Sequence, residues 1–201
     1  MPRASKEDAA RHRQEIIAAA AHLFRERGID GVSVPELMEA VGLTHGGFYR
    51  HFASKDELVA LALDAAFEQS EQYSTEILAE QDTAEAARRA YVERYLSPEH
   101  RANRGAGCPH AALSGDVGRS DRKSPLRGTY TKNLSDAVTR LIEMTPDKTP
   151  GKARQKAIST LASLVGAMVI ARASQGDPIS DEVLETVKAD LLADQPKRRA
   201  G

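Results

Sequence analysis

Apolar residues recur at three- and four-residue spacing along most of this chain, which is the period of a helix with one buried face. Strand patterns are rare, because β-branched residues seldom alternate with polar ones. The first helical run spans Arg13 to Arg27 and stops before Gly28, a residue that readily adopts a left-handed helix end. Together these patterns predict an all-α fold of about nine helices.

A helix-start signal opens the second predicted helix. Ser33 and Glu36 have the spacing of a capping box, and Pro35 lies where an early helical residue needs no N–H donor. The helix that follows, over residues 34–41, is expected to stop at Gly42.

A third, very short helix is predicted from His45 to His51, with Thr44 at its cap position. A second capping box, Ser54 and Glu57, then starts a longer helix that runs toward Leu78. Later helices are expected over residues 83–96, 108–117, 125–144, 152–174 and 179–193. The segment 97–107 has the composition of the least structured interior stretch.

Residues 34–51 combine two short helices with a glycine-containing turn, which is the layout of a helix-turn-helix. The second helix of that motif enters the DNA major groove, which is about 12 Å wide. No acidic residue lies between Glu39 and Asp56, and the basic side chains of this window are His45, Arg50, His51 and Lys55. This local positive charge predicts phosphate contact through one surface.

Aromatic residues of the window divide by position. Phe48 and Phe52 are four residues apart and are expected to pack the short helix onto its neighbours. Tyr49 faces the other way, so its hydroxyl either binds a phosphate or lies in water while the ring packs.

Polar and small residues complete the predicted DNA surface. Lys55 at a helix N-terminus is electrostatically misplaced unless an anion lies near it. Gly46 and Gly47 either mark a weak turn or allow close approach to DNA. Further phosphate or base contacts are expected from Ser33, Thr44, His45, Arg50 and His51.

Composition restricts the other classes of function. The formal net charge is -1, so bulk charge decides nothing about nucleic acid. No apolar run is long enough to cross a bilayer and the N-terminus lacks the apolar core of a secretory signal, so a cytoplasmic protein is expected. No residue spacing indicates a metal site or a cofactor.

A single cysteine, Cys108, leaves two interpretations open. Pro109 suits the first position of a helix, which would place the sulfur near a helix N-terminus and favour a thiolate redox or electrophile sensor. Against this, a free cysteine is commonly a small buried hydrophobe. Pairing Cys108 with His110 or His100 would give an enzyme, but no third orienting group is evident, and we expect no catalytic activity.

Residues 16–63, and most clearly VSVPELMEAVGLTHGGFYRHFASKDEL, resemble the DNA-binding domain of the TetR/AcrR family of transcriptional regulators. The resemblance implies a homodimer with a three-helix DNA-binding domain and a C-terminal domain that dimerises and binds a small effector. GCPHAAL, residues 107–113, resembles a C-terminal variant found in part of this family. The residues that the resemblance places at or near DNA are Ser33, Thr44, His45, Gly46, Gly47, Tyr49, His51 and Lys55.

Dimerisation is also expected because one recognition helix reads too few base pairs for useful specificity. The two C-terminal helices carry the predicted interface, although packing within one chain would explain the same pattern. Its residues are Leu161, Val165, Met168, Val169, Val183 and Val187. Candidate effector-pocket residues, each of which core packing would also explain, are Phe67, Tyr73, Tyr91, Tyr95, Cys108 and Leu113.

The sequence therefore predicts a DNA-binding domain over 1–58, with a flexible arm over 1–11, an effector-binding and dimerisation domain over 59–195, and a disordered basic tail over 196–201. The expected function is a ligand-responsive DNA-binding transcriptional regulator, a repressor or, less often in such proteins, an activator. Its expected partners are a double-stranded DNA operator, a second copy of the chain and an unknown small-molecule effector, with no membrane.

Overall fold

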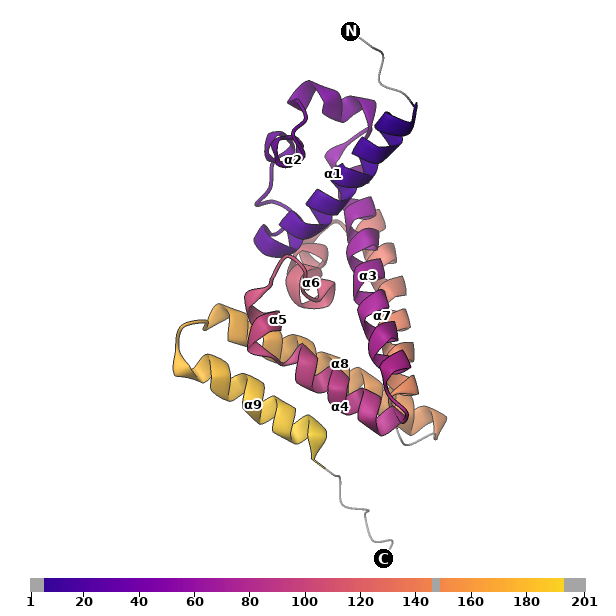
Figure 1. Cartoon of the computed structure of the whole chain (residues 1–201), viewed down its shortest axis with the longest axis vertical. Coiled ribbons are helices and arrows are strands. Elements are labelled where there is room, and N and C mark those ends of the chain that lie inside the picture. The colour runs from indigo at the N-terminus through magenta and orange to yellow at the C-terminus, as the bar shows by residue number, and fades with distance from the viewer. Residues whose placement is uncertain (1–5, 146–148, 194–201) are drawn as a thin grey trace, which may run out of the picture. The chain divides into compact units, whose positions relative to one another are not determined.

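The computed structural model describes residues 6–145 and 149–193, and these residues are helical with connecting turns (Figure 1). The predicted all-α fold is confirmed, with ten helical elements among the described residues where about nine were expected. In chain order they are α1 (Lys6–Arg27), α2 (Val34–Ala40), the 3-10 helix η1 (His45–Arg50), α3 (Lys55–Glu80), α4 (Ala84–Tyr95), α5 (Pro98–Ala102), α6 (Pro109–Arg119), α7 (Pro125–Glu143), α8 (Pro150–Ala173) and α9 (Pro178–Leu192).

Local signals set the boundaries of α2. The Ser33 hydroxyl accepts a hydrogen bond from the Glu36 amide, and the Glu36 carboxylate accepts one from the Ser33 amide at 2.8 Å, so the predicted capping box is present. Gly28 and Gly42 have φ values of +79° and +69°, which glycine adopts without steric cost. Both helix ends lie where the sequence placed them.

Three elements differ from the prediction. Helix α1 begins at Lys6, inside the stretch 1–11 that was expected to be a flexible arm, and its first turn carries acidic residues that suit a helix N-terminus. The element over His45–Arg50 is a 3-10 helix, consistent with the poor helix propensity of its two glycines. Helix α5 occupies Pro98–Ala102, in a stretch expected to lack structure, with the Ser97 hydroxyl accepting the His100 amide.

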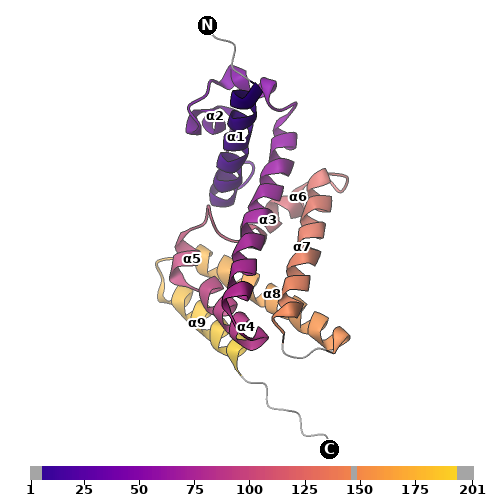
Figure 2. The same ribbon diagram turned by 45° about the vertical axis from the view of Figure 1, so that its right-hand side comes forward.

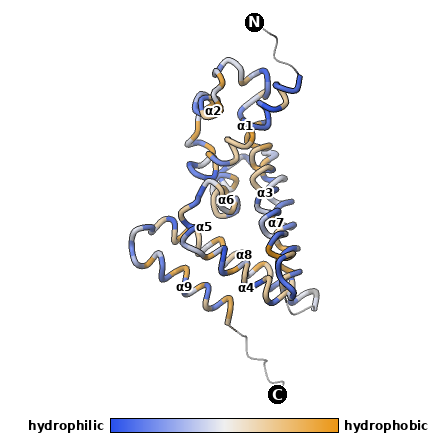
Figure 3. Tube along the Cα trace, in the orientation of Figure 1, coloured by the Kyte–Doolittle hydropathy of each residue, from blue (hydrophilic) through white to orange (hydrophobic). Residues whose placement is uncertain are grey.

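The chain divides into two compact units. The first comprises residues 1–73 and 103–137, and the second comprises 74–102 and 138–201. The core of the first unit is built by α1, α2, η1, the first half of α3, and α6. Its largest fully buried side chains are Ile16, Phe24, Leu37, Met38, Phe48, Phe52, Leu58, Leu63 and Leu113. The early turns of α1 are hydrophilic and its second half carries the apolar residues that enter this core (Figure 3).

In the second unit α8 packs against α5 and α9, and α9 also packs against α4 (Figure 2). Arg172 of α8 is buried and donates hydrogen bonds to the carbonyl oxygens of His100 and Arg101 at the end of α5. The inward face of α8 is formed by Ala153, Ala157, Thr160, Leu161, Leu164, Ala167, Met168 and Ala171. One described helix, Gly151–Ala173, is long and apolar enough to cross a membrane by length and composition, criteria that the core helix of a soluble protein also meets.

The basic tail predicted over 196–201 lies outside the described residues.

Candidate nucleic-acid interface

Two phenylalanines fasten η1 to the rest of the first unit. Phe48 is 0% exposed and Phe52 is 2% exposed, and their ring centroids are 5.4 Å apart. The predicted core role of both residues is confirmed. Because one face of η1 is held in this way, its other face is free of the protein interior.

That outer face carries the residues expected to meet DNA. Tyr49 is 69% exposed, and its ring and that of Phe48 are nearly perpendicular, at 5.3 Å between centroids. Thr44, His45, Gly46 and Arg50 are also exposed. The exposed side chains of η1 therefore include a phenol, a guanidinium and an imidazole, all of which can donate hydrogen bonds.

The two glycines of η1 differ in their surroundings. A Cβ atom on Gly46 would meet nothing within 4 Å, whereas one on Gly47 would lie 3.5 Å from the Met38 methyl carbon. Neither residue has a positive φ. Nothing within the described residues therefore requires glycine at position 46.

Ser33 and Thr44 occupy the two cap positions of the motif. Ser33 is exposed, and its hydroxyl is paired with Glu36, whose pKa is lowered chiefly by that hydrogen bond and by the Ser33 amide. Thr44 is the cap residue of η1, but its side chain makes no capping hydrogen bond. The Thr44 hydroxyl therefore does not cap η1.

Lys55 lies at the start of α3, as expected, but its side chain turns toward the loop between α1 and α2. Its ammonium donates hydrogen bonds of 2.9 Å to the Ile29 carbonyl and 2.7 Å to the Val32 carbonyl. These acceptors stabilise the charge without an anion, which removes the argument that a lysine at this helix end requires one. An ammonium has three N–H donors, so two carbonyls leave one N–H for another acceptor.

Arg13 of α1 reaches the turn that connects η1 to α3. Its Nε donates to the His51 carbonyl at 3.3 Å, and its Nη2 lies 3.1 Å from the Glu57 carboxylate. The guanidinium also lies over the Phe52 ring, 5.0 Å from the centroid. In the sequence, Arg13 is only one of several basic residues near the N-terminus. The one local signal that involves its partner Glu57 is the predicted capping box of Ser54 and Glu57, which does not point to Arg13.

The His51 imidazole lies among positive groups. Partial burial lowers its pKa, and His12, Arg13 and Arg50 lower it further. The His12 and His51 rings meet edge to face at 6.4 Å between centroids. This concentration of cationic or protonatable groups favours an anion at the same surface.

Three of the four candidate effector residues of the first unit are buried. Phe67 and Leu113 are core residues, Cys108 is 7% exposed, and Tyr73 is half-buried. Cys108 is the cap residue of α6 with Pro109 at the first helical position, as the sequence indicated. His110, Phe67 and Tyr130 form an aromatic group in the same unit. The His110 ring centroid lies 4.7 Å from that of Phe67 and 5.1 Å from that of Tyr130.

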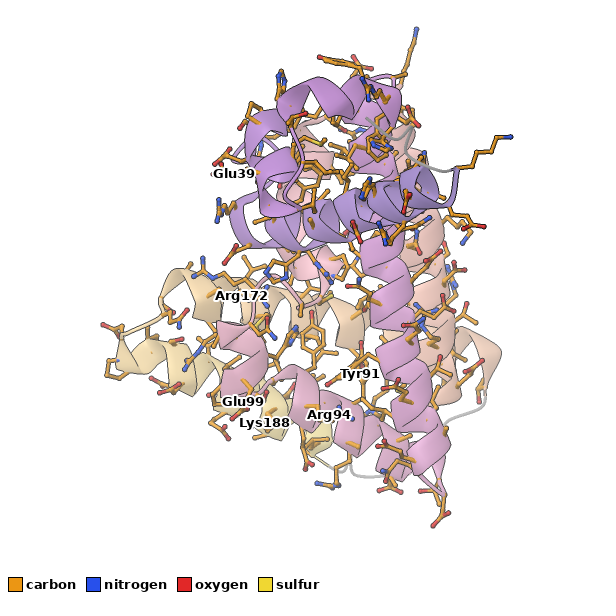
Figure 4. The ribbon with its side chains drawn as sticks, turned by 45° about the horizontal axis from the view of Figure 1, so that its top comes forward. Glu39, Tyr91, Arg94, Glu99, Arg172 and Lys188 are labelled. Atoms are coloured by element: carbon orange, nitrogen blue, oxygen red, sulfur yellow. The ribbon has the colours of Figure 1, made fainter. Side chains whose placement is uncertain are left out.

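The remaining effector candidates, Tyr91 and Tyr95, lie on α4 in the second unit. Their ring centroids are 5.9 Å apart, and Tyr95 packs edge to face on His100 at 4.6 Å. The His100 Nδ1 lies 2.6 Å from the Tyr95 carbonyl oxygen, which holds the imidazole in place. Figure 4 shows Tyr91 on α4, with Arg172, Glu99 and Lys188 on the elements that make up this unit.

The residues expected at the dimer interface differ in how far they are buried within one chain. Leu161 and Met168 are 5% and 0% exposed, so they belong to the chain's own core. Val169 is 44% exposed, and Val165, Val183 and Val187 are half-buried. Further apolar side chains exposed on α8 and α9 are Ile158, Ile170 and Ile179.

Residues 6–145 and 149–193 contain no group of three or more His, Cys, Asp or Glu side chains that could hold a metal ion.

The chain is similar to known proteins both in its N-terminal segment and over most of its length. Residues 16–62 match a family model described as bacterial regulatory proteins, tetR family. An uncharacterized HTH-type transcriptional regulator of Mycobacterium tuberculosis is 27% identical over 192 residues, covering 92% of this chain and 97% of that protein. The HTH-type transcriptional repressor AcnR of Corynebacterium jeikeium is 38% identical over 58 residues, covering 29% of this chain and 31% of that protein.

Among solved structures, a TetR-family transcriptional regulator from Cytophaga hutchinsonii superimposes with a TM-score of 0.75 at 25% identity. The match covers 95% of this chain and 96% of the other. These three similar proteins are all described as transcriptional regulators or repressors.

Proposed function

Because the chain belongs to the TetR family of DNA-binding transcriptional regulators, we propose that it is a cytoplasmic repressor that binds a palindromic operator as a homodimer and is released by a small-molecule effector. The observation that carries this proposal is the exposed outer face of η1. Phe48 and Phe52 hold the helix from within, while Tyr49 and Arg50 project from an acid-free stretch of chain. A short helix presented in this way can enter a major groove.

The proposed DNA contacts are of two kinds: some position the protein on the duplex, and others read the base sequence. The Tyr49 hydroxyl and the side chains of Ser33, Thr44 and His51 bind phosphates and set the register on the duplex. The third N–H of Lys55 binds a further phosphate. His45 and Arg50 face the base edges, where an arginine recognises guanine through two acceptors.

Gly46 and Gly47 bring the backbone of η1 close to the DNA. A side chain at position 46 would meet nothing inside the protein, so the absence of one is explained by the approach of a second molecule.

Two copies of the chain associate through the apolar face that α8 and α9 leave exposed. Val165, Val169, Val183 and Val187 form its centre, and small residues such as Ala162 allow close helix approach. Exposed aliphatic side chains on adjacent helices are unfavourable in water, and a two-fold dimer covers the same face on both copies. Leu161 and Met168 support this face from inside the chain.

The effector acts by preferring the DNA-incompetent arrangement of the dimer. A ligand that bound both arrangements equally would shift nothing, however tightly it bound. The candidate contacts remain Phe67, Tyr73, Tyr91, Tyr95, Cys108 and Leu113, and the least accessible of these are Leu113, Phe67 and Tyr95.

The experiment is selection of genomic DNA fragments by the purified protein, followed by footprinting of the enriched sequences. We expect a pseudo-palindrome whose half-sites are protected together and are spaced by about 10 base pairs or a multiple of that distance. A reporter gene placed after that sequence should be expressed more strongly when the regulator is absent. Enrichment of no palindrome would contradict operator binding, and lower reporter expression without the regulator would contradict repression.

A further inference from the structure

The turn after η1, residues 51–54, is held by a side chain that comes from α1. Arg13 donates to the His51 carbonyl at the end of η1 and stacks over the Phe52 ring, 5.0 Å from its centroid. The side chain is 35% exposed, so most of it is withdrawn from solvent. One guanidinium thus contacts both the backbone and the buried anchor of the recognition helix.

Glu57 closes the same turn from the side of α3. One of its carboxylate oxygens accepts from Arg13 at 3.1 Å, and the other accepts from the Ala53 amide at 2.7 Å. The Glu57 amide donates in turn to the Ser54 hydroxyl. The connection between η1 and α3 is therefore fixed by one ion pair, and the charge of Arg13 is balanced within the protein.

We propose that Arg13 is a positioning residue for DNA binding: it fixes the orientation of η1, and hence of Tyr49 and Arg50, without binding a phosphate itself. The inference rests on the proposed function. Arg50 directly precedes His51, so a shift of the His51 carbonyl moves the side chains that face the groove.

Lysine cannot replace arginine in this role. The planar guanidinium stacks on a ring while donating in two directions, whereas an ammonium is a single point charge on a flexible stem. At a phosphate contact, by contrast, lysine retains the attraction. The pair of variants Arg13→Met and Arg13→Lys therefore distinguishes positioning from direct contact.

The test measures the affinity of each variant for the selected operator duplex by fluorescence anisotropy between 50 and 300 mM NaCl, conditions in which phosphate contacts set the slope (roughly −0.9 per contact). We expect Arg13→Met and Arg13→Lys each to lose about tenfold in affinity at every salt concentration, with the slope of the parent. Lys55→Met, which removes the ammonium proposed to bind a phosphate, should flatten the slope by about 0.9 for each protomer. Arg119→Met, which removes an exposed guanidinium from α6, is the matched control and should bind like the parent.

Three results would overturn the assignment. If Arg13→Lys regains the parent's affinity, or if Arg13→Met flattens the salt slope, Arg13 is a phosphate contact. Unchanged affinity in both variants would mean that η1 is held without Arg13.

Hydrogen exchange in the free protein provides a readout that needs no DNA. In Arg13→Met, and not in Arg119→Met, the amides of residues 51–54 should exchange several-fold faster while the amides of α6 are unchanged. Equal exchange in parent and variant would contradict the positioning role. Failure of the parent to bind any duplex would instead contradict the proposed function, so the two failures are distinguishable.

Discussion

The guanidinium of Arg25 is buried in the first unit and donates a hydrogen bond of 3.2 Å to the carbonyl oxygen of Gly107. It also donates to the Ala21 carbonyl at 2.9 Å and to the Gln69 side-chain oxygen at 2.6 Å. These three acceptors are neutral. Burial consequently lowers the pKa of Arg25 to about 10, an effect that nearby Cys108 partly offsets.

This contact ties α1 to the segment that leads into α6. Two residues before Gly107, a Cβ atom on Gly105 would lie 2.2 Å from the His22 ring, so no side chain fits there without rearrangement. His22 and Arg25 are three residues apart on α1 and therefore share a face. The end of the 103–107 segment is held against that face by close packing and by a buried donor.

Removing this donor should destabilise the protein. Arg25→Met keeps much of the side-chain volume but leaves the buried carbonyl groups of Ala21 and Gly107 short of a hydrogen bond, for an expected loss of about 2 kcal/mol in the free energy of unfolding. Urea denaturation followed by circular dichroism measures the change. Arg119→Met is the matched control, because Arg119 is 73% exposed where it pairs with Asp116. A midpoint for Arg25→Met equal to that of the control would show that the buried contact contributes nothing.

Substitution of Gly46 should separate stability from DNA binding. Because a methyl group at Gly46 meets no atom within 4 Å, Gly46→Ala should leave the free energy of unfolding unchanged or raise it by up to about 1 kcal/mol. The same methyl group should lower operator affinity, about tenfold or more, if the backbone of η1 approaches DNA closely. Thermal unfolding and anisotropy titrations measure the two quantities.

Gly118→Ala is the control for Gly46→Ala, since Gly118 lies on α6 and a Cβ atom there also meets nothing within 4 Å. It should match the stability effect without the loss of affinity. Full operator affinity in Gly46→Ala would refute close approach at this position.

Local signals explain how much of this fold could be predicted. The Ser33–Glu36 box and the left-handed glycines at 28 and 42 act within a few residues, and the boundaries of α2 and the end of α1 agree with them. The same kind of signal is present at Ser97-Pro98, because serine followed by proline is a helix start, and α5 begins there although the composition of residues 97–107 predicts little structure.

Long-range partners explain what could not be predicted. Lys55 has a helix-terminal position in the sequence, yet its ammonium is engaged by two carbonyl groups 23 and 26 residues away. Arg13 and Glu57 are separated by 44 residues, and Arg25 and Gly107 by 82. Periodicity identifies which helix face is buried, but it does not reveal which basic side chain is engaged by another element.

Stability should fall as the solution is acidified, in part because of His100. Burial lowers the pKa of this imidazole most strongly, and Arg172 lowers it further, while the hydrogen bond to the Tyr95 carbonyl acts in the opposite direction. The folded protein therefore binds fewer protons at His100 than the unfolded chain does. The stabilisation is fully present above the unfolded pKa of about 6.5 and is lost as the pH falls through and below that value.

Urea midpoints at pH 7.5 and 5.5 measure this dependence. His100→Gln cannot titrate, so its midpoint should fall less between the two conditions than that of the parent. His45→Gln, which replaces an exposed histidine of η1, should fall as much as the parent. An equal fall in parent and His100→Gln would exclude His100 as a source of the pH dependence.

The exposed apolar face of α8 and α9 should govern oligomeric state. Val169 is 44% exposed in one chain, so Val169→Asp should leave the fold of that chain intact while placing a carboxylate in the proposed interface, where an unpaired charge is strongly unfavourable. Sedimentation velocity should show the parent as a dimer and Val169→Asp as a monomer at low micromolar concentration.

The affinity of Val169→Asp for the full operator should be lower than that of the parent, because the dimer is lost. Its affinity for a single half-site should not change, because each protomer retains its own η1. Thr131→Asp adds the same charge at an exposed position of α7 and should remain dimeric. A dimer that persists in Val169→Asp, with undiminished operator affinity, would show that the two copies associate through another surface.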